Sequence, residues 1–256
     1  MVGGFFIKKS LIMSTGIERY LKMQEACYNH LASSWSIHKR DPLVGCFDEH
    51  ETWEDYNYLF DGMFDFHNNA NHLQKASELV VLDFGCGPAR NLVKYGKHFK
   101  RIDGVDISAE VIEKAKEWLT DRDAWNENRL FVCSGEDLCD IEDNYYDVVM
   151  STITLQHICV HSIRLRLLKE FFRVLKNGGW FTAQMGFGKG KQGSVSYKSN
   201  YYDALTTNGW YDTIVEDPEE LRLDLESIGF SNFDYFIRPV GPCDSHPNWI
   251  FFRAKK

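Results

Sequence analysis

The stretch that decides the fold is Val80-Val81-Leu82-Asp83-Phe84-Gly85-Cys86-Gly87-Pro88-Ala89-Arg90. An apolar, β-branched run ends in an acidic residue, and a glycine-rich turn follows it. This order is typical of a buried parallel strand that leads into the ligand crevice of an open α/β sheet. Glycine lets the backbone approach a ligand where a side chain would collide with it. We therefore expect a ligand-binding turn at Gly85 and Gly87.

A second strand-like run, Ile102-Asp103-Gly104-Val105-Asp106, ends in an acid 21 residues after Gly85. An acid at this distance is placed to accept hydrogen bonds from the two hydroxyls of a ribose. Asp106 also suits the start of the next helix, although Ser108 is available as the cap. Together the turn and Asp106 predict a cofactor that contains a nucleoside.

The spacing of the small residues indicates which cofactor this is. A dinucleotide fingerprint needs a small residue at position 90, where this chain has Arg90. The sequence instead resembles the class I S-adenosylmethionine (SAM)-dependent methyltransferases, whose motif reads (E/D)-x-G-x-G-x-G. Asp83, Gly85 and Gly87 match that motif, and Ala89 takes the place of its last glycine. The resemblance covers about Val80 to Gly179 and implies SAM as the cofactor.

The resemblance also implies roles for residues around the turn. Asp83 would orient the turn or accept from the cofactor's ammonium group, and Arg40 and Arg90 are candidates for its carboxylate. An acid after the third strand typically binds the adenine amino group; both Glu136 and Asp137 are available, and Asp137 is slightly favoured. The full set of expected cofactor-binding residues is Asp83, Gly85, Cys86, Gly87, Arg90, Asp106, Ile107, Glu136, Asp137, Ser151 and Arg40.

The segment from Tyr146 to Ile158 resembles the family's fourth strand and its continuation. His157 lies just beyond the strand and is the candidate catalytic residue, because an imidazole can accept a proton at neutral pH. A structural histidine bonded to the backbone explains the same residue equally well, since many members of the family need no base. The candidate acceptor-binding residues are Thr154, Gln156, His246, Tyr197 and Tyr201, and for His246 a turn histidine is the simpler interpretation.

The order of apolar patterns predicts the domain organisation. We expect an N-terminal extension at 1–13, a helical cap at 14–78 and a methyltransferase domain at 79–256. The domain would be Rossmann-like α/β: a seven-stranded, mostly parallel sheet with a terminal antiparallel strand and helices on both faces. Residues 186–216 are too long for a simple connection and predict a substrate-side insertion that acts as a mobile lid.

Composition narrows the function further. The 256 residues carry a net charge of -8, which argues against a nucleic-acid partner because such partners call for a basic surface. Seven cysteines without a C-x-x-C pair favour thiols in a reducing cytoplasm and no metal site. No run has the length of a membrane-spanning helix, so no membrane partner is expected. The oligomeric state stays open.

These observations favour methyl transfer from SAM to an oxygen or nitrogen nucleophile of a small molecule, such as a sugar, an amine or a phosphorylated metabolite. The first alternative is a non-catalytic SAM-binding subunit that regulates a partner. The second is an oxidoreductase with a nucleotide cofactor, which Arg90 argues against.

Overall fold

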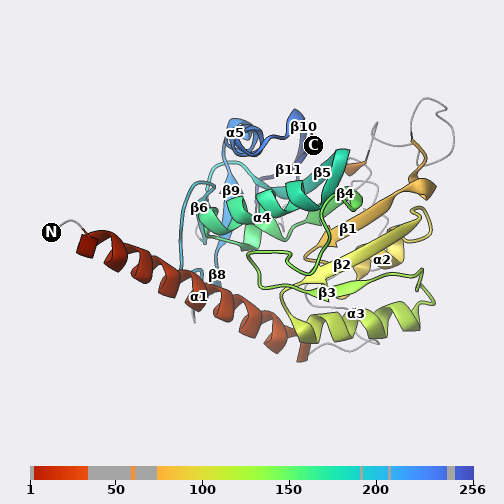
Figure 1. Cartoon of the computed structure of the whole chain (residues 1–256), viewed down its shortest axis with the longest axis horizontal. Helices are drawn as coiled ribbons and strands as arrows, with labels where there is room; N and C mark the ends of the chain where they lie inside the picture. The colour runs from red at the N-terminus through yellow and green to blue at the C-terminus, as the bar shows by residue number, and fades with distance from the viewer. Residues whose placement is uncertain (1–2, 34–58, 61–73, 191–192, 207–208, 241–245) are drawn as a thin grey trace.

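The computed structural model describes residues 3–33, 59–60, 74–190, 193–206, 209–240 and 246–256. A central sheet crosses the molecule, with helices on both of its faces (Figure 1). Its strands lie in the order β3-β2-β1-β4-β5-β11-β10. The bounds of these strands are β1 Val80–Phe84, β2 Arg101–Asp106, β3 Leu130–Val132, β4 Tyr146–Thr152, β5 Leu175–Phe187, β10 Ser231–Pro239 and β11 Asn248–Lys255.

The expected α/β sheet is confirmed, with two differences in detail. The antiparallel strand β11 is last in the chain but lies inside the sheet, where it pairs antiparallel with both β5 and β10. The sheet also has nine strands rather than seven, because β6 (Ser194–Ser196) and β9 (Asp212–Val215) join it through β5. Within the described residues, β7 (Leu205–Thr206) and β8 (Gly209–Trp210) form a separate pair.

Alternating side chains of the strands divide the core into two layers. Leu82 and Phe84 of β1 face the layer under α4 (His161–Val174) and α5 (Pro218–Ile228). Val81 faces the opposite layer, under α2 (Arg90–Tyr95) and α3 (Ala109–Asp121). This period-two burial on both faces explains why the strands read as nearly continuous apolar runs. Because β1 pairs in parallel with β2 and with β4, the carboxyl ends of these three strands lie at one edge of the sheet.

The helix ends follow local chemistry. The Asp217 side chain accepts from the Glu219 amide at 3.0 Å and caps α5, as the Asp-Pro sequence predicts, and Gly229 ends that helix with φ 120°. Ser108 caps α3 by accepting from the Val111 amide. Ser162 has a residue type that favours an N-cap, but it does not cap α4. That helix begins at His161, and the Ser162 amide donates to Asn200 Oδ1 at 2.9 Å, so the cap comes from the insertion.

The N-terminal helix α1 runs from Gly3 to Ser33 and crosses the boundary expected at residue 13 without a break. It lies along α3 at the edge where the cavity described below opens (Figure 1). Between residues 34 and 73 of the expected helical cap, the structure describes Leu59 and Phe60, both buried. No helix among the described residues is both long and apolar enough to cross a membrane.

Candidate functional site

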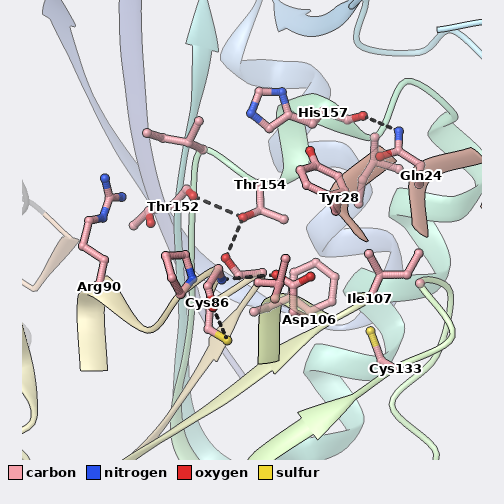
Figure 2. A pocket seen from close by; sticks show the side chains of 18 of the residues that line it. Gln24, Tyr28, Cys86, Arg90, Asp106, Ile107, Cys133, Thr152, Thr154 and His157 are labelled. Carbon is pink, nitrogen blue, oxygen red and sulfur yellow. Dashed lines mark hydrogen bonds between the residues drawn. The ribbon is translucent and has the colours of Figure 1, made fainter. Parts of the chain in front are cut away.

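A cavity opens at the carboxyl ends of β1, β2 and β4, where α1 covers it (Figure 2). It encloses about 1080 Å³ of space, including the solvent at its mouth. Its lining combines the glycine-rich turn with apolar and aromatic side chains. The lining residues are Tyr20, Leu21, Gln24, Tyr28, Phe84, Gly85, Cys86, Gly87, Pro88, Arg90, Asn91, Asp106, Ile107, Val111, Cys133, Gly135, Thr152, Ile153, Thr154, His157 and Ile158.

The two glycines of the turn are needed for different reasons. Gly85 has φ +70°, and a Cβ there would stand 2.2 Å from the Thr154 methyl group. Gly87 has φ +54°, and a Cβ there would meet no atom within 4 Å. Gly85 is therefore required by packing, whereas Gly87 keeps the cavity open for a ligand. Ala89 adopts φ 68° in place of the family glycine, so the chain accepts backbone strain to keep this turn.

Asp106 joins the turn to the end of β2. Its Oδ2 accepts from the Gly87 amide at 3.2 Å and its Oδ1 accepts from the Ser108 amide at 3.1 Å. Burial raises the pKa of the Asp106 carboxyl to about 6, although these amides oppose the rise. Each carboxylate oxygen can accept more than one hydrogen bond, so Asp106 keeps capacity for a ligand's hydroxyl groups.

Asp83 lies beneath the turn, fully buried and behind the lining. Asn91 of α2 donates to Asp83 Oδ2 at 3.0 Å and to Thr152 Oγ1 at 3.1 Å, and Asn91 itself lines the cavity. Burial raises the pKa of Asp83 to about 7. Asp83 Oδ1 and Asn91 Oδ1 are buried without a hydrogen-bond partner among the described residues. Two acceptors next to the turn therefore suit a donor on a ligand.

His157 stands on a short 3-10 helix, η4 (Leu155–His157), directly after β4. Its Nδ1 lies 2.7 Å from Asp212 Oδ1, and Asp212 Oδ2 lies 3.3 Å from Nε2 of His246. Asp212 belongs to β9 and is contributed by the insertion. An imidazole that lines a cavity and is backed by a carboxylate is a recurring arrangement for accepting a proton.

Helix α1 holds the main chain of η4 in place. Gln24 Nε2 donates to the His157 carbonyl at 3.0 Å, and the Tyr20 hydroxyl donates to the same oxygen at 3.2 Å (Figure 2). The Tyr20 oxygen in turn accepts from the Cys159 amide at 2.8 Å. Just before η4, Ile153 adopts φ 67° at the cavity wall, an unusual conformation for a β-branched residue that marks a constrained site.

The structure brings together many of the residues predicted from the sequence. Thr154 donates to the Gly85 carbonyl at 3.2 Å and so ties the loop after β4 to the turn. His157 lines the cavity, and its imidazole pairs with Asp212 instead of the neighbouring backbone that the structural alternative requires. The predicted residues that line the cavity are Gly85, Cys86, Gly87, Arg90, Asp106, Ile107, Thr154 and His157.

Other predicted cofactor residues lie away from the lining. The Ser151 hydroxyl is fully buried and donates to the Phe84 carbonyl at 3.2 Å. Glu136 pairs with Arg166 of α4, and Asp137 accepts from the Cys139 amide at 3.4 Å. The third-strand loop instead reaches the cavity through Cys133 and Gly135. Arg40 lies outside the described residues.

The predicted acceptor residues are also mostly structural. Gln156 Oε1 accepts from the Gly186 amide at 3.0 Å. Tyr197 is buried against His161 and Arg164, and Tyr201 packs on Tyr211 at 5.0 Å between ring centroids. In the described part of 186–216, β9 pairs with β5 and β6, and the lid function of this segment stays a prediction.

Sequence reasoning missed several residues of the site. Gln24 stands one helical turn after Tyr20, so the helical pattern contained a signal for it. Asn91 follows the turn in the first turn of α2, where a polar residue facing a ligand is recognisable. Asp212 is 55 residues from His157, and no local pattern connects the two.

The lining residues fit SAM as the ligand. Asp106 would accept from the ribose hydroxyls, and the unpartnered oxygens of Asp83 and Asn91 suit an ammonium group. The apolar side chains of Leu21, Ile107 and Val111 would surround the adenine ring. No group of His, Cys, Asp and Glu among the described residues is arranged to hold a metal ion.

Comparisons with known proteins agree with this geometry. The family model described as "Methyltransferase domain" matches residues 82–183. A curated relative, "Probable methyltransferase ltbC" from Aspergillus luteorubrus, is 34% identical over 106 residues. That match covers 39% of this chain and 37% of the relative, so the chain spans little more than a third of that relative's length.

Solved structures share the fold at low identity. A SAM-dependent methyltransferase from Methanosarcina mazei superposes with a TM-score of 0.57 at 20% identity, over 73% of this chain and 95% of that chain. One chain of the complex that contains the Haloferax volcanii Trm112 methyltransferase activator gives 0.59 at 15% identity, over 89% and 96% of the two chains. At these identities the likeness shows the fold alone.

Proposed function

Because residues 82–183 form a domain of the class I SAM-dependent methyltransferase superfamily, we propose that this protein transfers the methyl group of SAM to an oxygen or nitrogen nucleophile of a small molecule. The observation that carries the proposal is one continuous cavity, with the glycine-rich turn and Asp106 on its wall together with His157. The turn and Asp106 suit a nucleoside, and His157 suits an acceptor that must lose a proton.

SAM supplies a methyl group on a sulfonium: as the nucleophile bonds to the methyl carbon, the carbon–sulfur bond breaks and its electron pair stays on sulfur. The protein's own residues position the reactants and receive the proton. Asp106 and the Gly85–Gly87 turn bind the nucleoside end, and Thr154 holds the turn against η4. Helix α1 covers the cavity and keeps water from the site, which favours in-line approach of a bound acceptor.

Two observations support a small acceptor. The lining is largely apolar and covered by α1, which suits a molecule that enters the cavity rather than the surface of a polymer. The net charge of -8 is also unfavourable for a nucleic acid. The regulatory alternative gains no support from His157 and Asp212, because a protein that only binds SAM has no need of a carboxylate-backed imidazole. We further propose a cytoplasmic location, from the cysteine usage.

Calorimetry and mass spectrometry test the proposal. SAM and S-adenosylhomocysteine should bind with an affinity that NAD does not approach, and a panel of hydroxyl and amine acceptors incubated with methyl-deuterated SAM should yield a product carrying the label. His157→Ala should lower kcat by about 10²–10⁴-fold and leave the Kd of S-adenosylhomocysteine unchanged. Tight NAD binding would refute the cofactor assignment, and SAM binding without turnover on any acceptor would favour the regulatory subunit.

A further inference from the structure

Asp212 lies between two histidines at the acceptor end of the cavity. Its Oδ1 is 2.7 Å from His157 Nδ1, and its Oδ2 is 3.3 Å from His246 Nε2. The exposed fraction of the side chain falls from 27% for His157 to 17% for Asp212 and 2% for His246. The row of His157, Asp212 and His246 therefore runs from the cavity wall into the protein, with the Asp212 carboxylate in the middle.

The surroundings keep Asp212 ionised. Burial alone would raise the pKa of the Asp212 carboxyl, but hydrogen bonds from His157 and His246 outweigh it and hold that pKa well below its usual range. The other ionisable groups described near the pair are Tyr20 and Tyr28 of α1, Cys159 after η4 and Arg164 of α4. Burial raises the pKa of each tyrosine and of the thiol, so all three are neutral and leave Asp212 as the anion.

The fold fixes this geometry from several directions. Strand β9 pairs with β5 at Gly186↔Ile214, beyond the end of β4, which delivers Asp212 to η4. A Cβ at Gly186 would stand 2.4 Å from the His246 ring, so the glycine leaves room for that imidazole. Arg164 is 1% exposed and donates to Thr213 Oγ1 at 2.9 Å and to the Ile158 carbonyl, which ties β9 to the residue after His157.

We propose that Asp212 is a positioning residue that holds His157 with its proton on Nδ1 and presents Nε2 to the acceptor. This inference rests on the proposed methyl transfer, and it narrows the acceptor to one whose nucleophile arrives carrying a proton, above all a hydroxyl group. His246 Nε2 lies 3.3 Å from the other carboxylate oxygen, within ion-pair distance.

The proton balance of the step is simple. As the acceptor oxygen bonds to the methyl carbon, its proton passes to Nε2 of His157, while the sulfur retains the electron pair of the broken bond. His157 then carries a proton on each nitrogen, and Asp212 stabilises the positive charge without taking a proton itself. The imidazolium returns its proton to water when the product leaves.

Nitrogen NMR tests the tautomer without any turnover. In the wild-type protein bound to S-adenosylhomocysteine, long-range ¹⁵N–¹H spectra above the titration of the ring should show the His157 proton on Nδ1. In Asp212→Asn, the neutral amide can present either its oxygen or its NH₂ group to Nδ1, so the strong preference for the proton on Nδ1 should be lost and a signal for the proton on Nε2 should appear. A wild-type His157 with its proton on Nε2 would overturn the proposal, whatever the variant does.

Turnover gives the second readout. Asp212→Asn should lower kcat by about 10²-fold, at the low end of what a general base contributes. S-adenosylhomocysteine affinity should stay within about threefold, which separates failure of this proposal from failure of the cofactor assignment.

Asp224→Asn is a matched control. Asp224 forms a second histidine–aspartate pair, with His161 Nε2 at 2.7 Å, and neither residue lines the cavity. Both variants should lower stability, but the control should leave kcat and the His157 tautomer in place. If Asp212→Asn behaves like Asp224→Asn in both readouts, Asp212 is merely structural and the proposal is wrong.

Discussion

Cofactor affinity should depend steeply on pH, because bound SAM favours the ionised form of two buried carboxyls: Asp106 on the cavity wall, and Asp83 directly behind the lining residue Asn91. Burial raises the pKa of Asp83 to about 7 and that of Asp106 to about 6. An ammonium group and two ribose hydroxyls both favour the ionised carboxylates as acceptors. Below these pKa values, the protein without its cofactor holds the protons of Asp83 and Asp106, so SAM binding at such a pH must release them.

The size of the effect follows from the two pKa values. At pH 7 about half of Asp83 and about nine-tenths of Asp106 are ionised, but at pH 5 only about one-hundredth and one-tenth are. The product of these fractions falls by about 500-fold, or about 4 kcal/mol. The α-amino group of SAM stays protonated throughout this range, since such groups titrate near 7.7–8.0. The pH dependence of the affinity therefore comes from the carboxyl groups of the protein and not from the ligand.

Calorimetry with S-adenosylhomocysteine between pH 5 and 7 measures this dependence. Titrations at pH 6 in two buffers of different ionisation enthalpy should show release of about 1.4 protons per ligand. Asp106→Asn should reduce the pH effect to about 50-fold, and Asp83→Asn should reduce it to about tenfold. An affinity constant within threefold from pH 5 to 7, with no proton release and the fold intact by circular dichroism, would refute the reasoning.

Three further predictions concern stability. Asp83→Asn should be as stable as the wild type near pH 4 but more stable above pH 7 by up to about 4 kcal/mol. The reason is that the raised pKa of Asp83 lowers the stability of the folded wild-type protein as the pH rises through about 7. Urea unfolding at both pH values measures this difference. Gly87→Ala should cost only about 1–2 kcal/mol but weaken cofactor binding, whereas Gly85→Ala should unfold the turn, as thermal melts of both variants will show. Arg164→Ala should destabilise by about 3 kcal/mol or more in the same assay, since it leaves buried carbonyls without a donor.

The cofactor half of the site was predictable because its signals are local. The strand, the turn and Asp106 follow one another within a single β-α-β unit, and each glycine stands where the backbone needs a positive φ. The adenine end was less predictable. The acids at Glu136 and Asp137 were chosen by sequence position, but Arg166 of α4 pairs with Glu136, and the backbone at Gly135 is what reaches the cavity.

The acceptor half depends on contacts between distant segments, which a single sequence does not encode in any pattern. Residues 186–216 read as a loop because their polar composition hides short strands, of which β9 forms by pairing with β5 and β6 forms by pairing with β9. The start of α4 likewise depends on a residue from a distant segment, which no local pattern in the sequence indicates. Ser162 has the right residue type, but Asn200, far along the chain, is the residue that accepts from the helix.

The two halves of the site therefore have different origins in the chain. Apart from Tyr28, Leu21 and their neighbours on α1, the cofactor-facing residues lie within the matched segment 82–183. Of the groups that hold His157, Tyr20 and Gln24 come before that segment, and Asp212 and His246 come after it. On the proposed function, substitutions at Asp212, which does not line the cavity, should alter proton acceptance with little change in cofactor affinity. This separation is physically reasonable, because the nucleoside is bound by backbone geometry common to the fold, whereas the choice of acceptor depends on side chains that the surrounding elements supply.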